Sequence, residues 1–164
     1  MKKTLLAVAL CLVMLFAFAA CGENQPSAKY TMDDGTYQGT GNQIKFHNGQ
    51  GPSTKLSITV KDNKITKIEF TKVPTTSAFG LWNGGGADYD NPTKALTADA
   101  QAWLDKFKTM TLDEIMEVKA NDPVNSADHY DGGSLEGMDV FTGATATSVC
   151  VVRAVQNAIR DNCK

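Results

Sequence analysis

The sequence predicts an α+β fold: a single domain in which a twisted, mainly antiparallel sheet packs against helices. Three patterns predict it, namely strand-like alternation over residues 54–70 and amphipathic helical spacing over residues 93–109 and 148–162. A period of two is typical of a strand with one buried face, and a spacing of three to four is typical of a helix with one buried stripe. Elements of both kinds bury their apolar faces against each other.

The N-terminal segment has the pattern of an export signal. A basic start, Met1-Lys2-Lys3, precedes an apolar run from Leu5 to Ala20. The run is shorter than the ~20 residues that a bilayer-spanning helix needs, and it ends in small residues, as secretory signal peptides do. The sequence "FAAC" at 18–21 resembles the lipobox of bacterial lipoproteins, which implies lipidation of Cys21 and a lipid anchor on the extracytoplasmic face of the cell membrane. The alternative is ordinary cleavage after "AFA" at 17–19, which would release a soluble secreted protein.

We therefore expect a lipoprotein signal peptide over residues 1–20, a lipidated tether over 21–30, and one folded domain over 31–164. The tether contains the polar stretch "GENQPSAK". The chain has a formal net charge of −2, which becomes −4 when Lys2 and Lys3 leave with the signal peptide. The sequence has no cluster of basic residues, which argues against nucleic acid as a partner.

The first elements of the domain read as strands. The turn-rich "DDGTYQGTGN" (33–42) predicts a turn and a short edge strand. In residues 54–70 a hairpin turn at Asp62-Asn63-Lys64 separates two alternating runs, and one face of the hairpin is expected to cover the core while the other faces water. The alternating apolar residues are Leu56, Ile58, Val60, Ile68 and Phe70.

Helices follow. Residues 91–110 predict a helix that Pro92 could start, with a core stripe of Leu96, Ala100, Trp103, Leu104 and Phe107. Thr111 and Glu114 have the spacing of a capping box for a short helix over 111–118. Residues 121–137 read as a loop. The last helix, over 148–163, has a buried face of Val151, Val152, Val155, Ala158 and Ile159.

The glycine-rich stretch 78–92 contains Phe79, Trp82 and Tyr89. Aromatic residues in a surface loop are either buried or used in binding. Two interpretations stay open: a lid packed over the core, or a wall for a flat ligand.

Cysteine and histidine residues predict neither a metal site nor a nucleophile. Cys150 and Cys163 are 13 residues apart, which is ~20 Å on one helix and too far for a disulfide, so we expect free thiols. His47 and His129 lie in loops without a neighbouring serine or cysteine nucleophile. We interpret both as surface residues, and a stand-alone enzyme is the less favoured reading.

The stretch "DVFTGATATS" (139–148) predicts an anion site. Gly143 allows close backbone approach, and Thr147 or Ser148 could cap the last helix, whose N-terminus favours negative charge. Hydroxyl groups around a helix start suit a phosphate. The simpler alternative is that the stretch is only a Ser/Thr-rich N-cap.

The residues Asp139, Thr142, Gly143, Ala144 and Thr145 match the flavinylation motif D-x-x-[ST]-G-A-T. The chain thus resembles the FMN-binding domain of the flavin-bearing subunits of sodium-pumping NADH:quinone oxidoreductase and Rnf complexes, which small exported lipoproteins also carry. The resemblance implies that a flavin transferase moves FMN from FAD onto Thr145 as a phosphoester. It also implies that Asp139 is the acid needed for modification and that Thr142, Gly143 and Ala144 shape the turn.

One segment departs from the family. Respiratory members carry a "TPGLG"-like segment near the flavin, and here "PTTSAFGLWNGGG" shares only Gly80-Leu81 with it. Trp82, Tyr89 and Tyr130 are candidates for contact with the flavin ring.

The function that follows from the resemblance is electron transfer. A covalent FMN on a membrane-anchored extracytoplasmic protein would carry electrons between a membrane redox complex and an external acceptor or reductase. The alternative is a non-redox surface lipoprotein that binds a ligand or partner without flavin.

Overall fold

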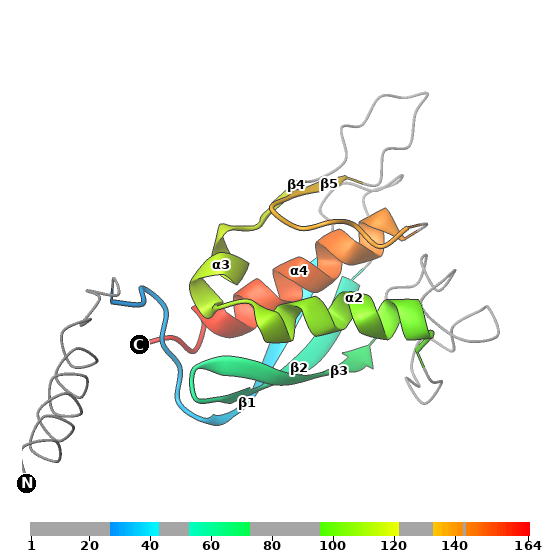
Figure 1. The fold of residues 1–164 in the computed structure, drawn as a ribbon. Coiled ribbons are helices and arrows are strands. Elements are labelled where there is room, and N and C mark those ends of the chain that lie inside the picture. Colours follow the sequence, from blue (N-terminus) through cyan, green and yellow to red (C-terminus); the bar gives the residue numbers. More distant parts are fainter. Residues whose placement is uncertain (1–26, 43–52, 73–95, 122–132, 143) are drawn as a thin grey trace, which may run out of the picture.

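The computed structural model describes residues 27–42, 53–72, 96–121, 133–142 and 144–164 (Figure 1). Several predicted features lie outside these ranges and are not described by it: the signal peptide, Cys21, the 78–92 loop with Trp82 and Tyr89, His47, His129, Tyr130 and Gly143.

A three-stranded antiparallel sheet forms the base of the domain, in the order β1-β2-β3. Its strands are β1 (Gly35–Asn42), β2 (Ser53–Lys61) and β3 (Lys64–Lys72). The predicted hairpin and edge strand are therefore confirmed. Asp62 and Asn63 alone form the turn, with φ of 50° and 59°. These left-handed values match a two-residue type I′ hairpin loop, so Lys64 belongs to the strand.

The buried face of the hairpin is the predicted one, with one addition. Leu56, Ile58 and Val60 are almost fully buried, and so is Ile65, which the alternation did not indicate. Thr59 pairs with Lys67 and Val60 pairs with Ile65, so β3 has one extra residue at this point. Because a bulge reverses the alternation, Ile65 and Phe70 share the core face despite their odd separation.

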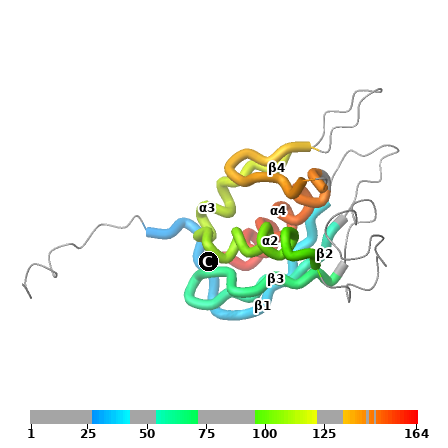
Figure 2. The backbone as a smooth tube through the Cα atoms, turned by 45° about the vertical axis from the view of Figure 1, so that its right-hand side comes forward, coloured from blue at the N-terminus to red at the C-terminus, as the bar shows by residue number. Residues whose placement is uncertain are grey.

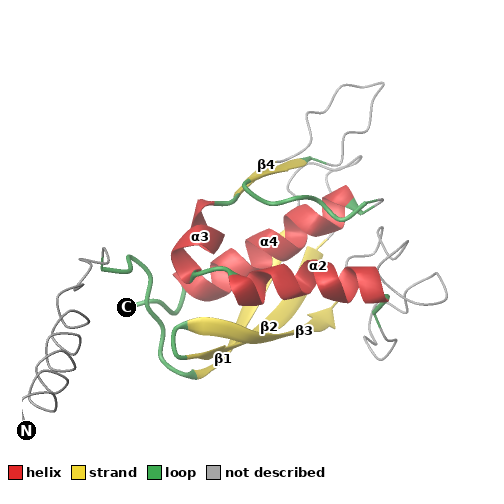
Figure 3. Ribbon diagram, viewed as in Figure 1, coloured by secondary structure: helices red, strands yellow, loops and turns green. Residues whose placement is uncertain are grey.

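Two long helices cover one face of this sheet (Figure 3). They are α2 (Ala98–Thr109) and α4 (Thr145–Arg160), and α2 carries the predicted core residues from Ala100 to Phe107. The predicted start of α2 was wrong at Leu96, which precedes the helix. The Thr97 hydroxyl accepts the Ala100 N–H at 3.2 Å, and this N-cap sets the first turn.

A short helix and a small two-stranded sheet complete the fold. In α3 (Leu112–Glu117) both hydrogen bonds of the predicted Thr111–Glu114 capping box are present. The predicted loop over 121–137 was wrong at both ends, because β4 (Lys119–Asn121) pairs with β5 (Ser134–Glu136). Strands of three residues have no periodicity to read, and this pairing depends on contacts with the rest of the fold, including α4.

Helix α4 is fastened to the edge strand β1 by side chains that reach main-chain carbonyls. The Asn157 amide donates to the Thr40 carbonyl and the Arg153 guanidinium donates to the Asn42 carbonyl, each at 2.8 Å. The guanidinium also donates to the Ala120 carbonyl of β4 at 2.8 Å. Thus α4 lies between the two sheets and contacts both.

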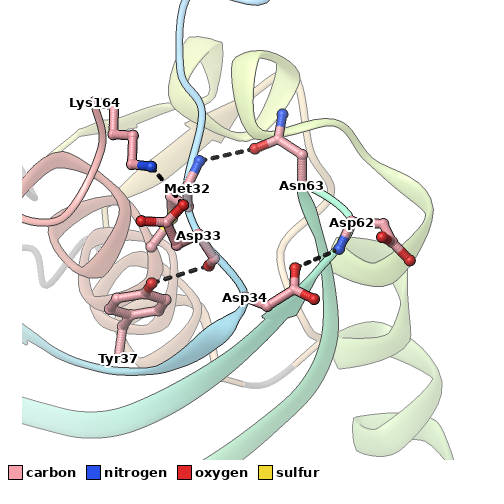
Figure 4. Close-up of polar contacts among 7 residues, drawn as sticks. All are labelled: Met32, Asp33, Asp34, Tyr37, Asp62, Asn63 and Lys164. Atoms are coloured by element: carbon pink, nitrogen blue, oxygen red, sulfur yellow. Dashed lines mark hydrogen bonds and ion pairs between the residues drawn. The ribbon is translucent and has the colours of Figure 1, made fainter.

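The segment before β1 is held against the hairpin turn and the C-terminus (Figure 4). The Met32 N–H donates to Asn63 Oδ1 and the Asp62 N–H donates to Asp34 Oδ1, each at 2.9 Å. Lys164 forms an ion pair with Asp33, and its N–H donates to the Thr31 carbonyl at 2.9 Å. Residues 31–34 are therefore a fixed part of the domain.

Both views of the chain place this N-terminal segment and the C-terminus at one end of the domain, while α4 begins at the other end (Figures 1 and 2). The 16 residues of α4 separate these ends by about 24 Å. None of the described helices has the length and apolar character needed to cross a membrane.

Candidate functional site

The motif residues lie on a connection between β5 and α4. Asp139 follows the small sheet, Thr142 is exposed on the loop, Ala144 is the N-cap residue of α4, and Thr145 is its first helical residue. The structure thus gathers the four described motif positions at the N-terminus of α4. Gly143 between them lies outside the described residues.

No side chain caps the N-terminus of α4 at Ala144, which has φ −139° and ψ 43°. The prediction that Thr147 or Ser148 caps the helix was wrong. The helix begins at Thr145, three residues earlier than expected, so both hydroxyls lie inside the first turn and are buried. The first-turn N–H groups of a helix have no intrahelical partner, and no acidic residue lies in this first turn. Within the described residues, the N-terminus of α4 therefore has no side-chain cap and is electropositive. Helix N-termini of this kind bind anions.

Ser148 instead fixes the loop that leads into the helix. Its Oγ accepts the Phe141 N–H at 2.8 Å and donates to the Ala144 carbonyl at 3.0 Å. A second turn bond joins the Ala144 N–H to the Phe141 carbonyl at 2.9 Å. These bonds fix Phe141 and Ala144 to the first turn of α4, directly before Thr145.

The hydroxyls around this terminus differ in their surroundings. Thr145 is half-buried, so it does not lie beneath the core. Thr147 is 1% exposed, and its Oγ has no hydrogen-bond partner within the described part of the chain. The hydroxyl of Thr54 on β2 is also buried without a partner among the described residues. Thr54 pairs with Gly41 of β1, and Gly41 lies against Cys150 of α4. A buried hydroxyl without a partner costs free energy.

Asp139 is held from α2. Its main-chain carbonyl accepts the Trp103 indole N–H at 2.7 Å, and its carboxylate pairs with the Lys106 ammonium at 3.1 Å. The sequence placed Trp103 in the core stripe, which is confirmed, but its hydrogen bond and the role of Lys106 were missed. A buried tryptophan usually finds an acceptor for its N–H, and that expectation was the only available signal.

A cleft of about 630 Å³ extends from Asp139 between the end of α2, α3 and the small sheet. Met110, Val118 and Met138 give it an apolar part, and charged residues line the rest. At its edge, a 2.7 Å hydrogen bond with Lys119 lowers the pKa of Glu136 and raises the pKa of Lys119 from their ordinary values. Both groups are therefore ionised at neutral pH, and neither is tuned toward proton transfer.

Other chemistry-bearing groups are sparse. Cys150 is buried and Cys163 is half-buried, and the two are not joined in a disulfide, as predicted. In the ranges that the structure describes, no three or more His, Cys, Asp or Glu side chains are grouped so that they could hold a metal ion.

The geometry distinguishes between the two readings of residues 139–148. A simple Ser/Thr-rich N-cap would show a hydroxyl accepting a first-turn N–H, and α4 has none at its N-cap. An anion site would lie at a helix N-terminus with a hydroxyl group at its start, and α4 begins at the half-buried Thr145.

Comparison with known proteins agrees with a phosphate-bearing ligand for this domain. The family model described as the FMN-binding domain matches residues 49–160, which is more than half of the chain and includes the whole of the 139–145 motif. No curated protein and no solved structure matches the chain.

Proposed function

Because the chain belongs to the FMN-binding domain family, we propose that it is an extracytoplasmic electron-carrier flavoprotein with FMN attached through a phosphoester to Thr145. FMN as the cofactor follows from the family. The covalent bond, the electron-transfer role and the location outside the cytoplasm are the proposal. The observation that carries it is the uncapped N-terminus of α4 with Thr145 as its first residue.

The residues at this terminus fit a phosphate group. The first main-chain N–H groups of a helix have no partner within the helix, and the helix dipole favours negative charge at this end. The Thr147 hydroxyl is buried and lacks a partner among the described residues. Thr145 is half-buried and stands at the start of the helix, next to this positive end.

The attachment is a group transfer without change of oxidation state. The Thr145 Oγ forms a bond to the phosphorus on the FMN side of the FAD pyrophosphate. The bond from that phosphorus to the bridging oxygen breaks, and AMP leaves with that oxygen and its electron pair. The hydroxyl proton of Thr145 passes to a base of the flavin transferase that catalyses the reaction.

The attached flavin supplies one- or two-electron redox chemistry, and the protein supplies its position. The chain's own residues contribute a fixed loop, through Ser148, and a helix terminus that retains the phosphate. A covalent bond keeps the cofactor on the protein outside the cell, where free FMN would diffuse away.

The placement of the N-terminal segment supports a carrier with an accessible flavin. The Lys29 and Tyr30 N–H groups donate to the Asp113 carboxylate at 2.9 and 2.8 Å, at the end of the domain far from Thr145. With lipid on Cys21, that end would face the membrane and the Thr145 end would face outward. A partner at the cell surface, such as a membrane redox complex or an extracellular reductase, could then approach the flavin.

A second candidate function is that of a ligand-binding lipoprotein without flavin. The cleft beside Asp139 favours it, because this cleft has an apolar part and charged walls but no group tuned for catalysis. The two proposals differ in one measurable property, which is a chromophore that survives denaturation.

The test is co-expression of the chain with a flavin transferase, followed by SDS electrophoresis with in-gel flavin fluorescence and intact-mass measurement. We expect fluorescence and an added FMN mass in the wild type and in Thr36→Val, and neither in Thr145→Val. Thr36→Val is the matched control, because it makes the same change at an exposed threonine of β1, whose hydroxyl lies 3.2 Å from that of Thr59. A wild-type band without fluorescence, under an active transferase, would refute covalent flavinylation. Loss of the visible absorbance of the labelled protein on reduction, and its return on oxidation, checks the electron-transfer role.

A further inference from the structure

We propose that Trp103 and Lys106 of α2 are positioning residues that hold the motif acid Asp139 for FMN attachment at Thr145. This inference rests on the proposed function and adds two residues outside the motif to it. Nothing in the motif sequence points to α2, which lies more than 30 residues earlier in the chain.

Trp103 anchors the main chain of Asp139. Its indole N–H donates to the Asp139 carbonyl at 2.7 Å, while the ring itself is 5% exposed. The ring also packs edge-on against Phe107, with centroids 5.7 Å apart and planes at 86°. Because the indole is packed in the core, its hydrogen bond fixes the start of the motif loop relative to α2.

Lys106 orients the side chain of the same residue. Its ammonium lies 3.1 Å from Asp139 Oδ2, and the Asp139 side chain is 89% exposed. Trp103 and Lys106 are three residues apart, so they lie on neighbouring positions of the same side of α2. The helix thus holds Asp139 through both its backbone and its carboxylate, yet leaves the carboxylate open to an approaching transferase.

The loop is held at a second point by Ser148, which binds the Phe141 N–H at 2.8 Å. Asp139 and Phe141 are therefore both held by hydrogen bonds, and Thr145 follows Phe141 by four residues. A reaction between two proteins requires its acceptor hydroxyl and its motif acid in a fixed mutual arrangement, because small misplacements at a reacting centre reduce rates strongly.

Lys106 can be removed with little effect on stability. Exposed ion pairs contribute little to folding, so the pair with Asp139 is not required for the fold. The same helix offers a matched pair for comparison, in which Lys108 lies 2.7 Å from Asp105 with both side chains partly exposed. A structural role would affect both lysines alike, whereas a positioning role would single out Lys106.

The test measures the initial rate of FMN transfer from FAD to the purified full-length chain by a flavin transferase that is active on another acceptor. The rate is followed by in-gel fluorescence over a range of chain concentrations. We expect Lys106→Met to lower kcat/KM by about five- to tenfold, the equivalent of one modest interaction lost. Lys106→Arg should restore the rate to within about twofold, because it keeps the charge. Lys108→Met should match the wild type.

Trp103→Phe keeps an aromatic ring in the core and removes only the N–H donor. We expect this variant to lower the transfer rate as well. If Trp103→Phe also lowers the melting temperature, the Lys106 variants alone decide the test. Equal rates for wild type, Lys106→Met and Lys108→Met would overturn the positioning role and leave the flavin proposal standing. A slow Lys106→Arg variant would overturn the role of the charge. Absence of labelling in the wild type would refute the proposed function itself.

Discussion

Gly41 of β1 lies directly against the main-chain carbonyl of Cys150 in α4. A Cβ atom on Gly41 would be 1.8 Å from that oxygen, and one on Gly39 would be 1.9 Å from the Ala154 carbonyl oxygen. The two glycines therefore let the backbone of the middle of α4, at Cys150 and Ala154, touch the edge strand. This contact sets where the helix, and with it Thr145, lies over the sheet.

Gly41→Ala should destabilise the domain by about 3 kcal/mol or more, because overpacking against backbone atoms cannot be relieved by a side-chain rotation. The measurement is the free energy of unfolding from urea denaturation. Gly35→Ala is the control, because its Cβ would meet only the Tyr37 side chain, at 3.1 Å or more. Similar unfolding free energies for the two variants would contradict the close helix–strand contact.

Ser148→Ala should increase the mobility of the motif loop before α4. The substitution removes two buried hydrogen bonds, to the Phe141 N–H and the Ala144 carbonyl, and we expect a loss of about 1–2 kcal/mol. Hydrogen exchange of the Phe141 amide, followed by NMR, should become faster, while amides in β2 respond only to the change in global stability. An unchanged exchange rate at Phe141 would show that Ser148 does not hold the loop.

Thr147→Val, unlike Ser148→Ala, should not destabilise the FMN-free protein. Its buried hydroxyl has no partner in the described ranges, so an apolar group of similar shape should leave stability unchanged or raise it by up to about 1 kcal/mol. Thermal and urea denaturation of the unlabelled chain provide the measurement. A clear loss of stability would mean that the hydroxyl is hydrogen-bonded without FMN, which would weaken its assignment to the phosphate site.

Glu114 should make α3 sensitive to acid. The Thr111 N–H, followed by the Thr111 hydroxyl, holds the pKa of this carboxyl below its ordinary value of 4.5. Since the folded-state pKa is the lower one, its contribution to stability is present above pH 4.5 and is lost as the pH falls through the folded-state pKa. Glu114→Gln should therefore differ from the wild type most at neutral pH and least in acid.

Melting temperatures measured between pH 7 and pH 3 check this behaviour. Glu117→Gln, at the other end of α3, is the control, because Glu117 takes no part in the capping box. A gap between wild type and Glu114→Gln that stays constant over the whole pH range would refute the role of the ionised carboxylate.

Local patterns predicted most of the elements because local interactions form them. The Asp62-Asn63 turn and the capping box at Thr111 depend on residues within a few positions of each other. Errors arose where distant contacts decided the outcome. The three-residue strands β4 and β5 pair across a gap in sequence, and Ile65 reaches the core only because of a bulge.

The sequence by itself determined the class of the domain and the location of its motif in the chain, because both depend on short-range order: periodicity, turn residues and five motif positions. The tertiary structure alone decided how the motif is supported. It moved the start of α4 to Thr145, buried Thr147 and Ser148 within the first turn, and brought Trp103 and Lys106 of α2 to Asp139. These contacts join residues far apart in the chain, and they exist only because two helices pack side by side on one sheet.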